Sequence, residues 1–173
     1  VSRETSNCPL ISEMIKLGRT LEDLGLTDTE TAVISVDYGK RPLINAKNVD
    51  AKKMTQQDVV EIVDYDPLKN IMMVIGPKDP DLETPVHWIV QKARQDINAL
   101  LQINSTGLVK KLNRTLPMTE NSTSSALLER AKDILKTLRN GKTILLKDKG
   151  ILFAGINTKE IEDALRTHLE VQQ

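Results

Sequence analysis

Three side chains in this sequence have types and spacing that suit acid–base chemistry. Glu83 stands just before Thr84-Pro85, a pair typical of a helix start, and His87 follows four residues later. A carboxylate beside a polarised carbonyl can abstract a proton, and a histidine can titrate near neutral pH. If Lys149 is buried beside Glu83, two roles are open to it. A lowered pKa would make its amine a nucleophile, whereas a charged ammonium would serve as a cation beside the reacting group.

Each of these residues also has an explanation that needs no chemistry. The helix dipole favours a carboxylate just before a helix, and we take this as the better explanation for Glu83. We expect His87 to be structural, and His168 lies near the end of the predicted final helix, where an imidazolium complements the dipole. Lys149 belongs to the polar interval 147–150, which predicts an exposed turn lysine.

Composition limits the classes of protein that remain. The 173 residues suffice for one domain with a sizeable core, so we predict a single domain over 1–173. The 24 basic and 24 acidic residues balance, and aromatic residues are only 2% of the chain, so neither a nucleic acid nor a membrane is an expected partner. No apolar run approaches a membrane span. The single cysteine, Cys8, excludes a disulfide framework and favours a cytoplasmic protein.

The apolar pattern predicts the elements that position these side chains. Helical spacing indicates helices at 10–24, 85–95, 122–140 and from 157 or 158 onward, with Gly25 ending the first. Strands are predicted at 32–36, 43–45, 59–63, 71–75, 97–104, 143–146 and 151–156, with a polar connection over 105–117. The continuous apolar run 71–75 predicts a central strand buried on both faces. Together the elements predict a three-layer α/β/α fold with a central mixed, largely antiparallel sheet.

Several strings resemble the class II aldolase/adducin family over roughly residues 10–169. Pro80-Asp81-Leu82-Glu83-Thr84-Pro85-Val86-His87 is similar to the family's Pro-Ser-Ser-Glu-x-Pro-x-His segment. Residues 93–101 look like its helix-to-strand passage, 144–155 like its apolar strands around a His-Gly turn, and 17–26 like its first helix and glycine exit. The resemblance implies the class II aldolase fold, a homo-oligomer such as a tetramer, and Glu83 at the position of the acid/base carboxylate.

The resemblance also implies a zinc site whose ligands differ in this chain. In active members, two histidines of a His-x-His strand end and one of the His-Gly turn bind zinc; the matching positions are Gln102, Asn104 and Lys149. A carboxamide oxygen is a poor zinc ligand, and an ammonium repels a divalent cation. We therefore expect no metal and no cofactor, with Gln102 and Asn104 as substrate-binding residues. The family's phosphate loops match 32–35, 45–48 and 81–82, where most of the hydroxyls and small residues are missing.

Three functions follow from these observations. The first is a protein without aldolase activity, acting as a small-molecule-binding or oligomeric scaffold module, as adducin head domains resemble the family without its metal site. The alternative is an aldehyde-lyase or related enzyme acting on a small hydroxy-carbonyl substrate through Glu83 and Lys149. The third is a residual metal enzyme using Glu83, His87 and a neighbouring subunit's groups, which is the least supported because two histidines leave few ligands.

Overall fold

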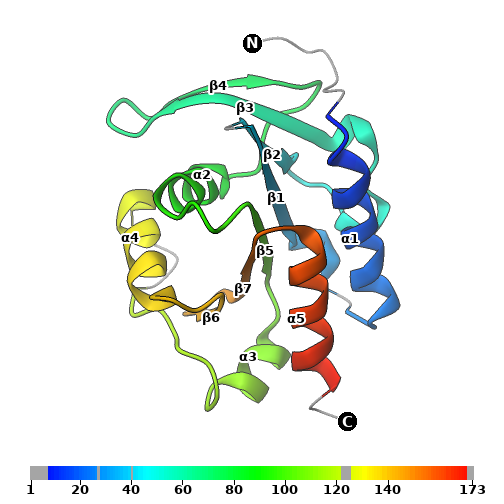
Figure 1. The fold of residues 1–173 in the computed structure, drawn as a ribbon, viewed down its shortest axis with the longest axis vertical. Helices are drawn as coiled ribbons and strands as arrows, with labels where there is room; N and C mark the ends of the chain where they lie inside the picture. The colour runs from blue at the N-terminus through cyan, green and yellow to red at the C-terminus, as the bar shows by residue number, and fades with distance from the viewer. Residues whose placement is uncertain (1–7, 27, 40, 122–125, 171–173) are drawn as a thin grey trace.

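The computed structural model describes residues 8–26, 28–39, 41–121 and 126–170, which build a seven-stranded sheet. The strand order is β4-β3-β2-β1-β5-β7-β6, and every neighbouring pair in this described sheet is antiparallel. The strands are β1 (Val33–Tyr38), β2 (Arg41–Asn45), β3 (Val59–Asp66), β4 (Ile71–Ile75), β5 (Ala99–Ile103), β6 (Thr143–Leu146) and β7 (Gly150–Gly155). Helices cover both faces (Figure 1), so the predicted three-layer, largely antiparallel α/β fold is confirmed.

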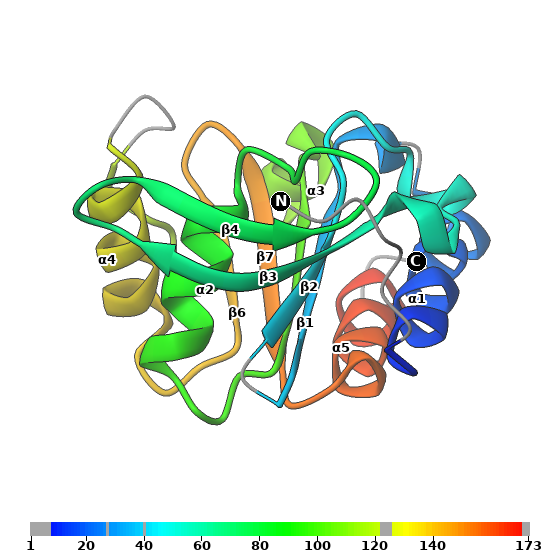
Figure 2. The same cartoon turned by 90° about the horizontal axis from the view of Figure 1, so that it is seen from above.

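Each face of the sheet has its own apolar core. The helices are α1 (Ile11–Asp23) and α5 (Thr158–Glu170) on one face, and α2 (Thr84–Ala93) and α4 (Leu127–Leu138) on the other (Figures 1 and 2). Leu17 of α1 and Leu165 of α5 pack with Phe153 of β7, whereas Val90 of α2 packs with Ile134 of α4. Full burial of such side chains contributes about 1.5–3 kcal/mol each, which holds the three layers together.

Strand β4 lies at the edge of the sheet, so the prediction of a central strand buried on both faces is wrong. Ile71 and Met73 are both 58% exposed, while Met72 and Val74 pack inward near Trp88 of α2. An apolar run alone does not distinguish a doubly buried strand from an apolar edge strand, because the neighbouring strands decide its burial. The β3–β4 ribbon therefore lies over α2, as Figure 1 shows.

The structure also differs from the predicted helices between residues 105 and 140. The connection 105–117 contains a helix that the prediction missed, α3 (Thr106–Leu112), whose N-cap Ser105 accepts a hydrogen bond from the Leu108 amide at 3.3 Å. The predicted helix 122–140 is α4, and residues 122–125 lie outside the described residues. Three short 3-10 helices are η1 (Thr29–Thr31), η2 (Ala51–Lys53) and η3 (Gln56–Asp58). Within the described ranges, no helix is both long and apolar enough to cross a membrane.

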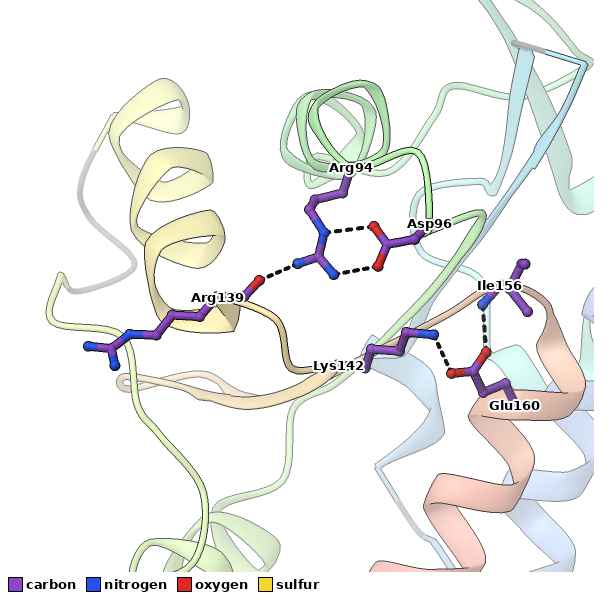
Figure 3. A network of polar contacts seen from close by, with 6 residues as sticks. All are labelled: Arg94, Asp96, Arg139, Lys142, Ile156 and Glu160. Atoms are coloured by element: carbon purple, nitrogen blue, oxygen red, sulfur yellow. Dashed lines mark hydrogen bonds and ion pairs between the residues drawn. The ribbon is translucent and has the colours of Figure 1, made fainter.

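Polar contacts join the C-terminal ends of α2 and α4 (Figure 3). Arg94, just after α2, donates to both carboxylate oxygens of Asp96, at 2.7 and 2.6 Å, and to the Arg139 carbonyl oxygen at 2.7 Å. Nearby, Lys142 donates to Glu160 of α5 at 2.6 Å. The Arg94–Arg139 bond ties the C-terminal end of α2 to that of α4.

Candidate functional site

A cleft lies at the end of the sheet where β1 and β7 begin and where β2 and β5 end. Its volume is about 270 Å³, and its lining includes all four predicted site residues, Glu83, Gln102, Asn104 and Lys149. A larger hollow of about 720 Å³ lies beside Lys78, but none of these four residues lines it. The smaller cleft is therefore the candidate site.

Glu83 lies between two cations in this cleft. Its Oε1 accepts a hydrogen bond from Lys149 Nζ at 2.5 Å, and its Oε2 accepts one from Arg130 of α4. Burial acts to raise the pKa of Glu83, but the hydrogen bonds and charges of Arg130 and Lys149 outweigh it and lower this pKa to about 2. The carboxylate is therefore ionised at neutral pH and has little basicity.

The ion pairs correct two predictions. Lys149 is not an exposed turn lysine, because its side chain is only 22% exposed and its ammonium contacts Glu83. Glu83 occupies the N-cap position of α2, yet its side chain makes no capping hydrogen bond, so the ion pairs explain it better than helix capping does. Arg130 was missed, because one arginine on the polar side of an amphipathic helix carries no local signal of a partner 47 residues away.

Behind Glu83, a buried chain of hydrogen bonds joins α2 to strands β1 and β5. His87 Nδ1 lies 2.6 Å from Ser35 Oγ, and His87 Nε2 lies 3.3 Å from Gln102 Oε1. Gln91 Nε2 donates to Ser35 Oγ at 3.0 Å. Burial lowers the pKa of His87 to about 4, so the ring is neutral at pH 7, and its buried contacts agree with the structural role expected for it.

His168 lies far from this cleft in α5. Its ring packs against Phe153 of β7, with 6.0 Å between the ring centroids. Burial lowers the pKa of His168, which disfavours the imidazolium predicted to complement the helix dipole.

The segments that match the family's phosphate loops are occupied by internal contacts. Asn45 accepts a hydrogen bond from the Ile34 amide at 2.7 Å and donates to the Ala32 carbonyl at 3.1 Å. Asp81 accepts a hydrogen bond from the Glu83 amide at 2.8 Å, and burial, with a smaller contribution from the Glu83 charge, raises the pKa of Asp81. These side chains hold the backbone around the cleft instead of offering donors to a phosphate.

The strand ends approach each other closely because Gly150 has no side chain. A Cβ atom at Gly150 would lie 1.9 Å from the Ile103 carbonyl oxygen and 2.9 Å from Asn104 Cα. The start of β7 can therefore lie against the end of β5, which brings Lys149 to the same cleft as Asn104 and Gln102.

The atoms at the three zinc-ligand positions do not suit a zinc ion. The Gln102 Oε1 atom is engaged by His87, and the Lys149 ammonium lies against Glu83. Elsewhere in residues 8–26, 28–39, 41–121 and 126–170, no three His, Cys, Asp or Glu side chains are grouped to hold a metal ion. Zinc prefers neutral imidazole, thiolate and carboxylate ligands, so this donor set does not fit it.

Known proteins with a similar sequence or structure share this fold. Residues 12–109 match the model of the Class II Aldolase and Adducin N-terminal domain. Among solved structures, an L-fuculose 1-phosphate aldolase aligns with a TM-score of 0.76 and 20% identity, covering 96% of this chain and 86% of that one. The sugar-phosphate aldolase from Thermotoga maritima aligns with a TM-score of 0.73 and 13% identity, covering 93% of this chain and 92% of that one. The l-fuculose-1-phosphate aldolase from Thermus thermophilus aligns with a TM-score of 0.70 and 19% identity, covering 95% of this chain and 92% of that one. No protein of curated function matches the chain significantly.

Proposed function

The chain belongs to the family of class II aldolases and adducin N-terminal domains, and we propose that it is a small-molecule-binding member that works without a metal ion or aldolase activity. The observation that carries this proposal is the Glu83 carboxylate held between Arg130 and Lys149. The family resemblance gives a carboxylate here the task of taking a proton beside a metal-polarised carbonyl. In this chain both of its oxygens are already occupied by cations.

The ion pairs make proton abstraction unfavourable. A general base works best when its pKa lies near the working pH, whereas the pKa of Glu83 is about 2. Proton transfer to Glu83 is therefore much less favourable than transfer to a base whose pKa is about 7. Lys149 donates to Glu83 as an ammonium, which has no lone pair for nucleophilic attack. The alternative of a lyase acting through these two residues is therefore less favoured.

The cleft supports binding of a small molecule. Its volume of about 270 Å³ is at the lower limit for ligand sites, which suits a ligand of a few heavy atoms. Gln102, Asn104 and Lys149 supply polar groups along its lining. The homo-oligomer expected from the family resemblance stays a prediction.

Proton exchange in a small hydroxy-ketone tests the absence of lyase chemistry. We expect dihydroxyacetone in D₂O with the protein to exchange its carbon-bound protons no faster than in buffer, as measured by proton NMR. Glu83→Gln, which removes the carboxylate, is expected to give the same rate. Exchange catalysed by the unmodified protein and lost in Glu83→Gln would contradict the proposal and support the enzyme acting through Glu83.

A further inference from the structure

The buried chain of hydrogen bonds behind the cleft has a direction. An amide nitrogen can only donate, so Gln91 Nε2 donates to Ser35 Oγ at 3.0 Å. The Ser35 hydroxyl accepts this bond and has its own hydrogen available for His87 Nδ1, 2.6 Å away. On the other side of the ring, Gln102 Oε1 can only accept, so His87 Nε2 is the donor there, and in a neutral ring Nδ1 is then the acceptor from Ser35.

The direction continues through the imidazole ring to the cleft. A neutral imidazole whose Nδ1 accepts a hydrogen bond carries its hydrogen on Nε2. Burial lowers the pKa of His87 to about 4, which keeps the ring neutral at pH 7. Nε2 then donates to Gln102 Oε1 at 3.3 Å. The two amide groups at the ends of this hydrogen-bond chain are oriented consistently: Gln91 presents its nitrogen to Ser35, and Gln102 presents its oxygen to His87.

Gln102 is left with a donor group and no partner for it. The residue is 2% exposed and lines the cleft, and its side chain makes no other hydrogen bond with the described residues. An NH₂ group accepts no hydrogen bond and coordinates no metal, so it selects an oxygen that accepts. Next to it, Lys149 keeps further N–H donors beyond the one that it gives to Glu83.

The charged groups in and behind the cleft include both signs. Glu83 carries one negative charge, Arg130 and Lys149 carry two positive charges, and the neutral His87 carries none. Nearer the rim, the exposed Lys47 and Glu30 offset each other, and the acidic Asp81, whose pKa burial raises, disfavours an anion on its own side of the cleft. The charged groups therefore balance overall, and the positive charge that faces the cleft beside the Gln102 donor is that of Lys149.

Resting on the metal-free function proposed above, we propose that the ligand is a small organic carboxylate whose oxygens accept hydrogen bonds from Gln102 Nε2 and Lys149 Nζ. Three residues act only as positioning residues: Gln91, Ser35 and His87. They do not contact the ligand themselves but fix the orientation of the Gln102 amide group that does.

The tautomer of His87 tests the direction of the chain. In long-range ¹H–¹⁵N NMR spectra of the labelled full chain at pH 7, we expect His87 to carry its hydrogen on Nε2. His168→Asn removes the other histidine signal and identifies that of His87. Ser35→Ala removes the donor to Nδ1, so we expect the Nδ1–H form to become populated. A His87 hydrogen on Nδ1 in the unmodified protein would reverse both hydrogen bonds of the ring, turn the Gln102 oxygen toward the cleft and overturn the proposal.

Binding of glycolate tests the ligand class. We expect glycolate to shift the side-chain NH₂ signals of Gln102 saturably, and methylammonium to leave them unchanged. Gln102→Glu replaces the donor with an acceptor of similar shape and is expected to weaken glycolate binding at least about 10-fold. Gln95→Glu makes the same charge change at an exposed site after α2 and is expected to change it less than about 2-fold.

Two outcomes would overturn the carboxylate proposal: no saturable response to glycolate, or equal binding by the Gln102→Glu and Gln95→Glu variants. These outcomes differ from a failure of the proposed function, which would appear as tight metal binding or as proton exchange that depends on Glu83.

Discussion

Replacing Glu83 with glutamine is expected to lower the free energy of unfolding at pH 7 by about 3 kcal/mol. The variant keeps the side-chain shape but leaves two cations without a counter-charge. The Arg130 side chain is 11% exposed and that of Lys149 is 22% exposed, so water compensates them only in part. Removing one partner of a buried ion pair costs more than the intact pair contributes, because the remaining charge stays desolvated. Urea denaturation followed by Trp88 fluorescence measures the change.

A surface ion pair provides the matched control. Lys159 and Asp163 lie 3.3 Å apart on α5, with side chains 75% and 63% exposed. Asp163→Asn is therefore expected to cost less than about 0.5 kcal/mol. Adding Lys149→Met to Glu83→Gln removes one unpaired charge and should recover part of the loss. A Glu83→Gln variant as stable as Asp163→Asn would show that the cations do not depend on Glu83.

Mild acid is expected to destabilise the fold through His87. Its pKa is about 4 in the folded chain, against an ordinary value of 6.5. Between these values the unfolded chain binds a proton that the folded chain does not, so stability falls as the pH drops from 6.5 to 4. A difference of about 2.5 units corresponds to about 3 kcal/mol. Glu83 acts in a lower window, because its pKa is about 2 instead of 4.5 and its contribution is lost below pH 4.5.

The two windows can be separated by measuring unfolding free energies from pH 7 to pH 3. His87→Gln is expected to be less stable at pH 7, because the hydrogen bonds of His87 are lost, and to show a flatter slope between pH 6.5 and 4. His168→Gln is the control; this partly buried histidine has a pKa that burial also lowers, so we expect a smaller flattening. An unchanged slope in His87→Gln would mean that the folded protein protonates His87 near its ordinary pKa.

Local patterns were enough to predict most of the fold. Gly25, with φ of +78°, ends α1 as expected, and Asn157 accepts a hydrogen bond from the Glu160 amide at the start of α5. The edge position of β4 and the short helix α3 could not be predicted in this way. A strand's place in a sheet depends on distant partners, and a seven-residue helix leaves too little periodicity to recognise.

The candidate site depended more on long-range contacts. The family resemblance pointed to Gln102, Asn104 and Lys149, and these residues meet because β5 and β7 are antiparallel neighbours. The partners that determine their chemistry, such as Arg130 and Ser35, belong to no local motif. Glu83 lies 47 residues from Arg130 and 66 from Lys149 in the sequence, so only the folded structure reveals the ion pairs.

Metal content tests the central proposal most directly. The unmodified protein and a triple variant carrying Gln102→His, Asn104→His and Lys149→His would be incubated with excess zinc, desalted and measured by elemental analysis. We expect almost no zinc in the unmodified protein and about one zinc per chain in the variant, whose imidazoles suit the metal. Near-stoichiometric zinc in the unmodified protein would contradict a metal-free site and make a metal-dependent lyase the leading function.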